Sequence, residues 1–498
     1  MKKVLLTMLG LFVLVFALSG ISYAWQGRMG GMGDPFGLVA DESDYLIHPA
    51  KIANGEGVRF YGDYRFLYTG VTDWDVDLDG AEASDFSGSE LRHNALLGAA
   101  FPLGPGRMGL FFTYEGRRGD FDFNDALTVI KLTDDLDNFA LRLLYGLPIG
   151  GFKLGAEVGF AHRQDEKELF IYATDMSGGF VNFHMIFPLI IFNVYLPPFA
   201  PYDSAYWEIP MKLGAEGKVG PLDLEFTLRG GIIVGGDNTL RINEQAPVGN
   251  VTAGVDMDGD VGGWRIGGDF WLRYPLTDSL TLPVLVRADY WEKTRDGDGF
   301  PPGAPANFFD YKHKQTGLDL AIGGGLDKVL AQGTRIAGGI YYNYLHGTED
   351  ISTMIFTSGV FTMGFDFNDF PTLTEHRATV RLAGEHEFSP TFALRMGLEG
   401  FYGWATQDLT FSILTPAGTG TYDISSDGSH WGIGASLGGS IRFKPITLEP
   451  FVNAGYQSLD LSGDGGVFDN GALTGTFDRD DTRNQWYVGG GLSILFDL

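Results

Sequence analysis

Charged side chains of both signs alternate with apolar residues along much of the chain. Between residues 58 and 69, Arg59, Asp63 and Arg65 fall on one face of an extended segment, and mostly apolar or aromatic residues fall on the other. Charges on a strand face are stable only in water or in satisfied ion-pair networks. This pattern predicts either paired charges that stiffen a wall or the lining of a water-filled lumen. The candidate lumen and constriction residues are Arg59, Arg65, Arg229, Arg265, Arg273, Arg377, Arg381, Arg395, Asp63, Glu225, Asp269, Glu385 and Glu399.

A second group of residues has the spacing of a cation site. Asp75, Asp77 and Asp79, followed by Gly80, resemble the start of an EF-hand loop, but the twelfth position is Phe86 instead of the bidentate Glu. The only ligand that we expect here is Ca²⁺ or Mg²⁺ bound between the loops. The alternative is that these carboxylates are simply solvated. We expect no other cofactor.

The sequence contains only weak matches to the motifs of enzyme active sites. The G-x-S-x-G pattern around Ser436 lies inside an alternating segment, whereas a nucleophile elbow needs a strand, a sharp turn and a helix. No H-E-x-x-H motif or P-loop occurs. We expect a protein that is not an enzyme, with a lipase or protease site assembled from scattered strand ends as the alternative.

Composition narrows the class further. The net charge of −28 argues against a nucleic-acid partner, and the absence of cysteine excludes disulfides and thiolate metal sites. Residues 1–24, with Lys2 and Lys3 before an apolar run and a small-residue end at Ser22-Tyr23-Ala24, predict a cleaved signal peptide. Beyond it, no apolar run is long enough to form a membrane-spanning helix.

The period of two predicts about sixteen strands, within a range of 14 to 18, that close into an all-β antiparallel transmembrane barrel. A set of β-sandwiches is the alternative. Glycine- and proline-containing turns alternate with long, acidic connections, which indicates short periplasmic turns, long extracellular loops and periplasmic termini in a Gram-negative outer membrane. The predicted spans are 57–69, 91–102, 107–118, 138–148, 151–164, 205–218, 221–234, 262–275, 281–293, 314–325, 334–347, 374–387, 391–404, 430–443, 446–459 and 485–498.

Two connections are apolar instead of acidic. One covers residues 180–199 and the other residues 351–367. Exposed apolar loops either pack on one another as a lid or contact an apolar ligand, and the sequence does not decide between these two alternatives. The residues of the first that could capture a ligand are Phe180, Phe183, Ile186, Phe187, Ile191 and Phe192.

The segment between the signal peptide and the first strand resembles the hatch of the FadL-type outer-membrane transporters. Met32-Gly33, Ala40-Asp41 and Pro49-Ala50 match the pattern of that family, while His48 and Lys51 replace its Asn and Gly. The resemblance implies a fourteen-stranded barrel, plugged by this hatch, that takes up hydrophobic compounds. It makes residues 25–56 a hatch segment, with Asp41, His48, Pro49 and Ala50 as its candidate residues, and residues 57–498 the barrel.

These observations predict an outer-membrane channel for passive uptake of small, possibly hydrophobic, molecules. The alternatives are a general diffusion porin with a charged lumen and a non-transport scaffold, such as the sheath of an electron conduit. The alternation that ends at Phe496 and Leu498 resembles the C-terminal signal read by the barrel-assembly machinery. Further expected partners are membrane lipid, lipopolysaccharide (bridged by divalent cations) and a small solute.

Overall fold

The chain folds as a single closed β-barrel in the computed structural model, with a short segment of the N-terminal region inside it. The structure describes residues 27–32, 38–39, 46, 48–78, 85–124, 128–173, 202–245, 252–300, 307–330, 333–357, 360–415, 418–469 and 472–498. The all-β fold and its sixteen antiparallel strands confirm the prediction from the two-residue period. The barrel therefore has two more strands than the FadL-type pattern implies.

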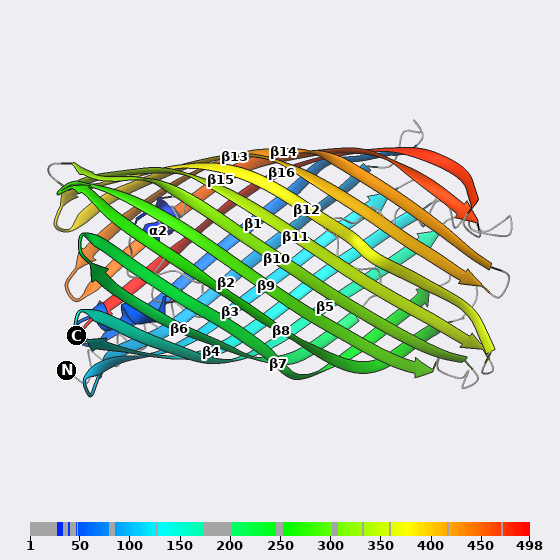
Figure 1. Cartoon of the computed structure of the whole chain (residues 1–498), viewed down its shortest axis with the longest axis horizontal. Coiled ribbons are helices and arrows are strands. Elements are labelled where there is room, and N and C mark those ends of the chain that lie inside the picture. The colour runs from blue at the N-terminus through cyan, green and yellow to red at the C-terminus, as the bar shows by residue number, and fades with distance from the viewer. Residues whose placement is uncertain are drawn as a thin grey trace.

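Every strand pairs with its neighbours in the chain, and β1 closes the barrel against β16 (Figure 1). The helical elements are α2 (Gly27–Gly31) and η2 (Pro49–Asn54). The strands are β1 (Arg59–Leu78), β2 (Asp85–Leu103), β3 (Gly106–Asn124), β4 (Thr128–Ile149), β5 (Phe152–Ala173), β6 (Tyr202–Val219), β7 (Leu222–Gln245), β8 (Thr252–Thr277), β9 (Leu280–Phe300), β10 (Asn307–Leu330), β11 (Thr334–Thr357), β12 (Val360–Ser389), β13 (Phe392–Thr415), β14 (Gly418–Phe443), β15 (Ile446–Asp469) and β16 (Ala472–Asp497).

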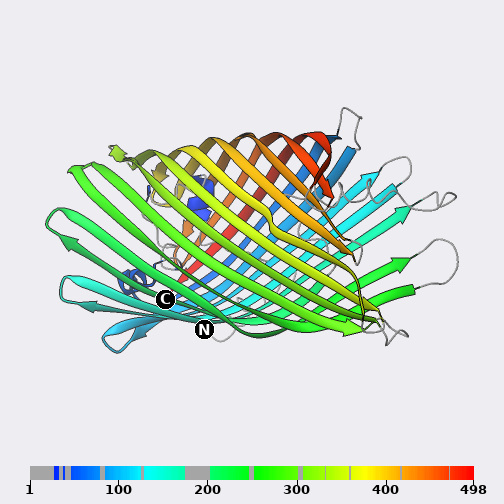
Figure 2. The ribbon, with the colours of Figure 1, turned by 45° about the vertical axis from the view of Figure 1, so that its right-hand side comes forward.

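The short turns lie where the sequence predicts them. Gly104, Gly150 and Gly220 adopt φ values of 59°, 62° and 60°, in the left-handed region that glycine tolerates best. These turns gather at one end of the barrel, where Arg59 pairs with Asp497 at the closing seam. Figures 1 and 2 show α2 inside the barrel toward this end.

The prediction of long acidic loops at the other end is wrong for most connections. The strands there continue well past the roughly ten residues that cross a bilayer, because a hairpin keeps its backbone ladder in water. Asp75 and Asp77, for example, lie in β1, where they pair with Thr482 and Asp480 of β16. The expected apolar loop over 351–367 is likewise a β11–β12 hairpin, since Ile351 pairs with Phe367.

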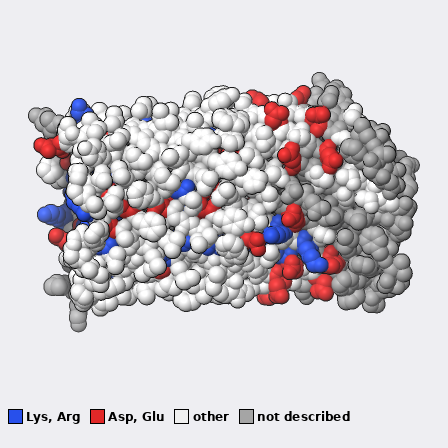
Figure 3. Space-filling view, viewed as in Figure 1, with Lys and Arg blue, Asp and Glu red and all other residues white. Residues whose placement is uncertain are grey.

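The outer surface of the barrel is apolar around its middle. In Figure 3 most of the surface between the two ends is uncharged, apart from a narrow line of acidic and basic atoms in the left half of the view. Large hydrophobic side chains are exposed on strands all round the barrel, as the hydrocarbon of a bilayer requires. They include Phe160, Leu213, Ile266, Ile340, Leu398, Ile433 and Val452.

Aromatic pairs mark the edge of this apolar band nearer the long hairpins. Tyr68 and Trp486 lie with ring centroids 5.3 Å apart, and His376 stacks on Trp404 at 4.9 Å. His376 thus lies among aromatic rings, as is typical of a membrane interface. No helix in the described part of the chain is long and apolar enough to cross a membrane.

Candidate functional site

The 3-10 helix η2 lies against the inner faces of β3, β4, β5 and β6. Pro49 begins this helix, where a fixed φ and a missing N–H cost nothing. Ala50 and Ile52 are almost completely buried, at 0% and 1% exposure. Leu46 and Ile52 form one apolar cluster with the barrel residues Tyr61, Leu96, Ala100, Phe111, Leu144 and Leu495. Burial on this scale seats η2 firmly in the barrel.

A transverse row of glycines makes room for η2. Gly146, Gly155 and Gly214 are direct partners across β4, β5 and β6. A Cβ on Gly155 would overlap the backbone of Pro49 and would lie 2.5 Å from the Cα of Ala50. Because those are backbone atoms, neither side can yield, so the glycine row sets how closely η2 approaches the wall.

A buried ion pair joins the same segment to β7. The ammonium nitrogen of Lys51 lies 2.8 Å from Glu225 Oε2, with exposures of only 8% and 5%, and 4.9 Å from the Trp271 ring centroid. Arg273 of β8 binds the same carboxylate. Since a buried charge is stable only when paired, Glu225 serves one cation of the hatch segment and one of the barrel.

His48, directly before η2, is 2% exposed. Burial lowers its pKa below the ordinary value of 6.5; the nearby carboxylate of Glu225 opposes this shift, and the ammonium of Lys51 adds to it. The imidazole is therefore neutral at pH 7.

The helix α2 contacts the opposite part of the barrel, β13 to β16. Arg28 makes a two-pronged contact with Glu385, from Nε to Oε2 at 2.9 Å and from Nη2 to Oε1 at 2.8 Å. Glu385 also accepts from Arg395 at 2.6 Å, and Arg395 pairs with Glu449 at 3.0 Å. The four side chains form one alternating charge network between hatch and wall.

Leu38 provides a third contact between the hatch segment and the wall. It lies over the paired glycines Gly325 and Gly339 of β10 and β11, where an added Cβ would be 2.7 Å and 2.6 Å from its Cδ2 atom. Leu38 and its neighbours from the hatch segment share an apolar cluster with strands β8, β9, β11 and β12. The cluster comprises Met29, Met32, Leu38, Val39, Trp271, Leu285, Ala337, Tyr341 and Ala383.

The remaining predicted lumen charges form separate pairs instead of a single constriction. Arg229 binds both Asp269 and Asp289, and Arg287 Nε lies 2.8 Å from Asp269. Arg265 pairs with Glu208 at 2.7 Å. The other predicted residues are placed as follows: Arg59 pairs with Asp497, Arg381 with Glu399 and Arg377 with Glu375, while Asp63 is buried and Arg65 lines the chamber described next.

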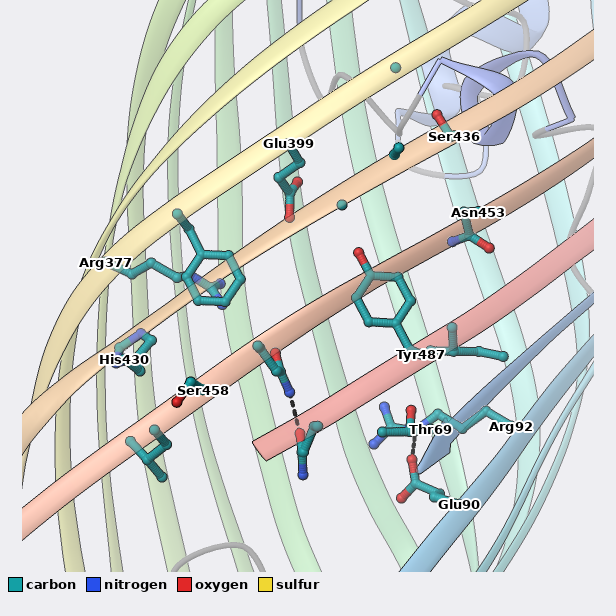
Figure 4. Close-up of a pocket in the computed structure, with 18 of the residues that line it drawn as sticks. Thr69, Glu90, Arg92, Arg377, Glu399, His430, Ser436, Asn453, Ser458 and Tyr487 are labelled. Atoms are coloured by element: carbon teal, nitrogen blue, oxygen red, sulfur yellow. Dashed lines mark hydrogen bonds and ion pairs between the residues drawn. The ribbon is translucent and has the colours of Figure 1, made fainter. Parts of the chain in front are cut away.

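Two hollows adjoin the hatch segment. A chamber of about 610 Å³ is bounded by β1, β2 and β12 to β16 and touches Gly30 of α2 (Figure 4). A vestibule of about 820 Å³ is lined by Arg28, Lys51 and Asn54 of the hatch segment and by the short-turn ends of the strands. Ser436 lines the chamber from within β14, so it lacks the strand–turn–helix setting of a nucleophile elbow.

Several predicted residues lie outside the described part of the chain. They are Asp41, Asp79, Phe180, Phe183, Ile186, Phe187, Ile191 and Phe192. Asp75 and Asp77 belong to an extended strand instead of a curled loop, which corrects the loop geometry expected for a cation site. Across the described residues, no group of three or more His, Asp or Glu side chains could hold a metal ion.

Sequence reasoning missed the contacts that seat the hatch segment, although it listed several of the residues that make them. The partnership of Lys51 with Glu225 joins residues far apart in the chain, and nothing in the spacing indicates it. The glycine row was detectable in part, because glycines in strand interiors often mark close approach by another backbone. Only the pairing register brings Gly146, Gly155 and Gly214 into line.

No protein-family model matches the chain, and no curated protein sequence matches it. Among solved structures it is similar to the Pseudomonas putida toluene transporter TodX, at 11% identity and a TM-score of 0.42, over 96% of this chain and 99% of that one. The Ralstonia pickettii toluene transporter TbuX shows 10% identity, a TM-score of 0.39 and coverage of 97% and 100%. A Pseudomonas aeruginosa FadL homologue shows 11% identity, a TM-score of 0.38 and coverage of 96% and 100%. Over nearly its whole length the chain is thus similar to solved transporters that include a FadL homologue, at identities and TM-scores too low to transfer a function.

Proposed function

We propose that this chain is a FadL-type outer-membrane channel for the passive uptake of small molecules, with residues 25–56 as its hatch. The observation that carries the proposal is the position of α2 and η2 inside the barrel, where both elements line the vestibule and α2 also touches the chamber through Gly30. A solute that moves along the barrel axis meets this segment.

The outer surface supports placement in a membrane. An apolar band with aromatic pairs at its edge is stable only where hydrocarbon covers it. We infer that the short turns and both ends of the barrel sequence face the periplasm, and that the acidic hairpins face outward. Divalent cations held between these hairpins and lipopolysaccharide, a small-molecule solute, and the assembly machinery that would read the C-terminal strand remain the predicted partners.

Planar-bilayer recording of the purified chain, with and without residues 25–56, tests the proposal. The intact protein should show near-zero steady conductance, because the hatch segment lies inside the barrel. The deletion should raise conductance, since sixteen strands enclose more space than their side chains fill.

Two outcomes would contradict the proposal. A large, steady conductance of the intact chain would identify a general diffusion porin, in which the charge pairs of the wall form the constriction. A conductance that stays near zero after the deletion would remove the gating role of the hatch segment and favour a non-transport scaffold. Heat stability of the deleted barrel provides the control for folding.

A further inference from the structure

The chamber above α2 differs in charge from the rest of the chain. Its described lining holds five arginines and three glutamates, whereas the whole protein carries a net charge of −28. Within the described residues, Arg65 has no carboxylate at ion-pair distance, so the chamber keeps a positive excess. The charged lining residues are Arg65, Arg92, Arg377, Arg381, Arg483, Glu90, Glu375 and Glu399. A net positive cavity of about 610 Å³ has the sign to attract an anion and the size to hold a small organic one.

Two aromatic rings lie over glycines of the same chamber wall. Phe401 of β13 covers Gly432, where an added Cβ would lie 2.5 Å from the Cζ of the ring. Tyr487 of β16 reaches over Gly455 to Gly434, and both glycines would clash with the ring if they carried a Cβ. Figure 4 shows the Tyr487 ring lying broadside along the wall.

These two rings approach each other over β14. Gly432 and Gly434 are two residues apart on one strand face, a separation of about 7 Å. Phe401 and Tyr487 therefore form an apolar shelf, in which the guanidinium of Arg377 lies over the Phe401 ring. A ligand ring stacked on Tyr487 would gain about 1 kcal/mol beyond its burial.

Arg377 lies over the Phe401 ring of this aromatic shelf. Its guanidinium carbon is 5.5 Å from the Phe401 ring centroid. Its ion pair with Glu375 is long, at 3.7 Å, and Glu375 is shared with His430 at 3.2 Å. In the described part of the chain, the buried Nε of Arg377 makes no hydrogen bond. The side chain is 40% exposed, and within the described residues its guanidinium donates no hydrogen bond, so its Nη atoms have donors left for a ligand carboxylate.

We propose that the chamber binds a small aromatic carboxylate, with its ring on Tyr487 and its carboxylate on Arg377. The inference rests on the proposed function, because such an anion would be a solute that the channel admits. The ligand would lie directly above α2, since Gly30 lines the same chamber.

Calorimetric titration of the full chain in lipid nanodiscs, at low salt, tests this site with four probes. Benzoate should bind more tightly than cyclohexanecarboxylate, which lacks a π face, and more tightly than toluene, which lacks a charge. Benzylamine, with the opposite charge, should bind most weakly. Equal binding of benzoate and benzylamine would overturn the proposal.

Variants localise the binding. Arg377→Gln should weaken benzoate binding about tenfold or more, as expected for the loss of a charge-assisted contact. Tyr487→Leu should abolish the preference for benzoate over cyclohexanecarboxylate while it keeps the preference over benzylamine. Lys314→Gln removes the same charge from an exposed position that does not line the chamber, and it should leave benzoate affinity unchanged.

Failure of this inference can be separated from failure of the proposed function. If benzoate affinity is unaltered in Arg377→Gln while deletion of residues 25–56 still opens the barrel, the ligand assignment is wrong and the channel stands. Arg377→Lys checks folding, because it keeps the charge and should retain part of the affinity. A loss of benzoate binding in Arg377→Lys and Lys314→Gln alike would also overturn the assignment.

Discussion

The two helical elements of the hatch segment are held in the barrel by different means. The η2 half presses its backbone into the row formed by Gly146, Gly155 and Gly214 and buries the ion pair between Lys51 and Glu225. The α2 half is only five residues long; it buries the side chain of Met29 against the wall, but its Arg28 remains 23% exposed to the lumen.

This difference indicates which of the two helical elements can leave the wall at the lower cost in free energy. Backbone-to-wall contact leaves no intermediate position for η2, whereas an ion pair at a water-accessible site exchanges readily with solvent and is screened by salt. We therefore expect α2 to leave the wall before η2. Because the chain has no cysteine, single variants Ile52→Cys and Met29→Cys can report each half separately by maleimide labelling.

The largest expected effect comes from Gly155→Leu. The new side chain would occupy the space of the Pro49 and Ala50 backbone, so η2 must leave the wall. We expect rapid labelling of Ile52→Cys and a conductance close to that of the hatch deletion. Gly151→Ala, at a glycine with open space around it, is the matched control and should label as slowly as the parent. Slow labelling in both variants would mean that the wall accommodates the added side chain.

A smaller effect is expected from the charges beneath η2, and it should depend on which partner is removed. Glu225→Gln leaves Lys51 buried without its carboxylate and should weaken docking by about 3–5 kcal/mol. Lys51→Met should cost less, because Arg273 still neutralises Glu225. The labelling rate of Ile52→Cys measures both. Equal rates in the two variants would contradict this asymmetry.

Arg28→Gln should act mainly on α2. Glu385 keeps Arg395 as a partner, so the expected loss is about 1 kcal/mol, which is roughly a fivefold increase in labelling of Met29→Cys. Labelling of Ile52→Cys should stay unchanged. High salt should imitate the variant at α2 and have little effect at η2. A salt effect of the same size on both reporters would remove the distinction between the two halves.

The smallest expected effect is one of pH. Burial keeps the pKa of His48 below 6.5, so the undocked imidazole takes up a proton more readily than the docked one. Docking is therefore at full strength above pH 6.5 and weakens as the pH falls below that value. The labelling of Ile52→Cys should rise over this range, and His48→Asn should remove the rise. A rise that persists in His48→Asn would assign the effect to another group.

The barrel was predictable because the two-residue alternation of apolar and polar side chains is a local pattern, which can be recognised without knowing which distant residues come together. All sixteen predicted strands exist, and the turns at Gly104, Gly150 and Gly220 are where their residue types indicate. The long-loop ends were not predictable in the same way, because acidic and glycine-rich strands in water have a weaker alternation. The assumption that a strand ends at the membrane edge made the predicted spans too short.

The candidate site was less predictable, because its contacts depend on register and on a segment without a period. The charges of the wall were identified as a class, but their division between hatch anchors, such as Glu225 and Glu385, and chamber residues, such as Arg377, depends on which strands become neighbours. The aromatic shelf also depends on register, because Tyr487 reaches its glycines across two neighbouring strands.

The closing seam sets an order for assembly. The first and last strands meet at Arg59 and Asp497, which are 438 residues apart, so the loop that the seam completes is almost the whole chain. The entropy of closing so long a loop makes this the last and slowest pairing to be expected. The hatch segment precedes β1 and touches β3 to β6 on one side of the seam and β13 to β16 on the other. By binding both groups of strands, it would fasten the two edges of the open sheet from within, so that the plug is enclosed as the barrel closes and need not be threaded in afterwards.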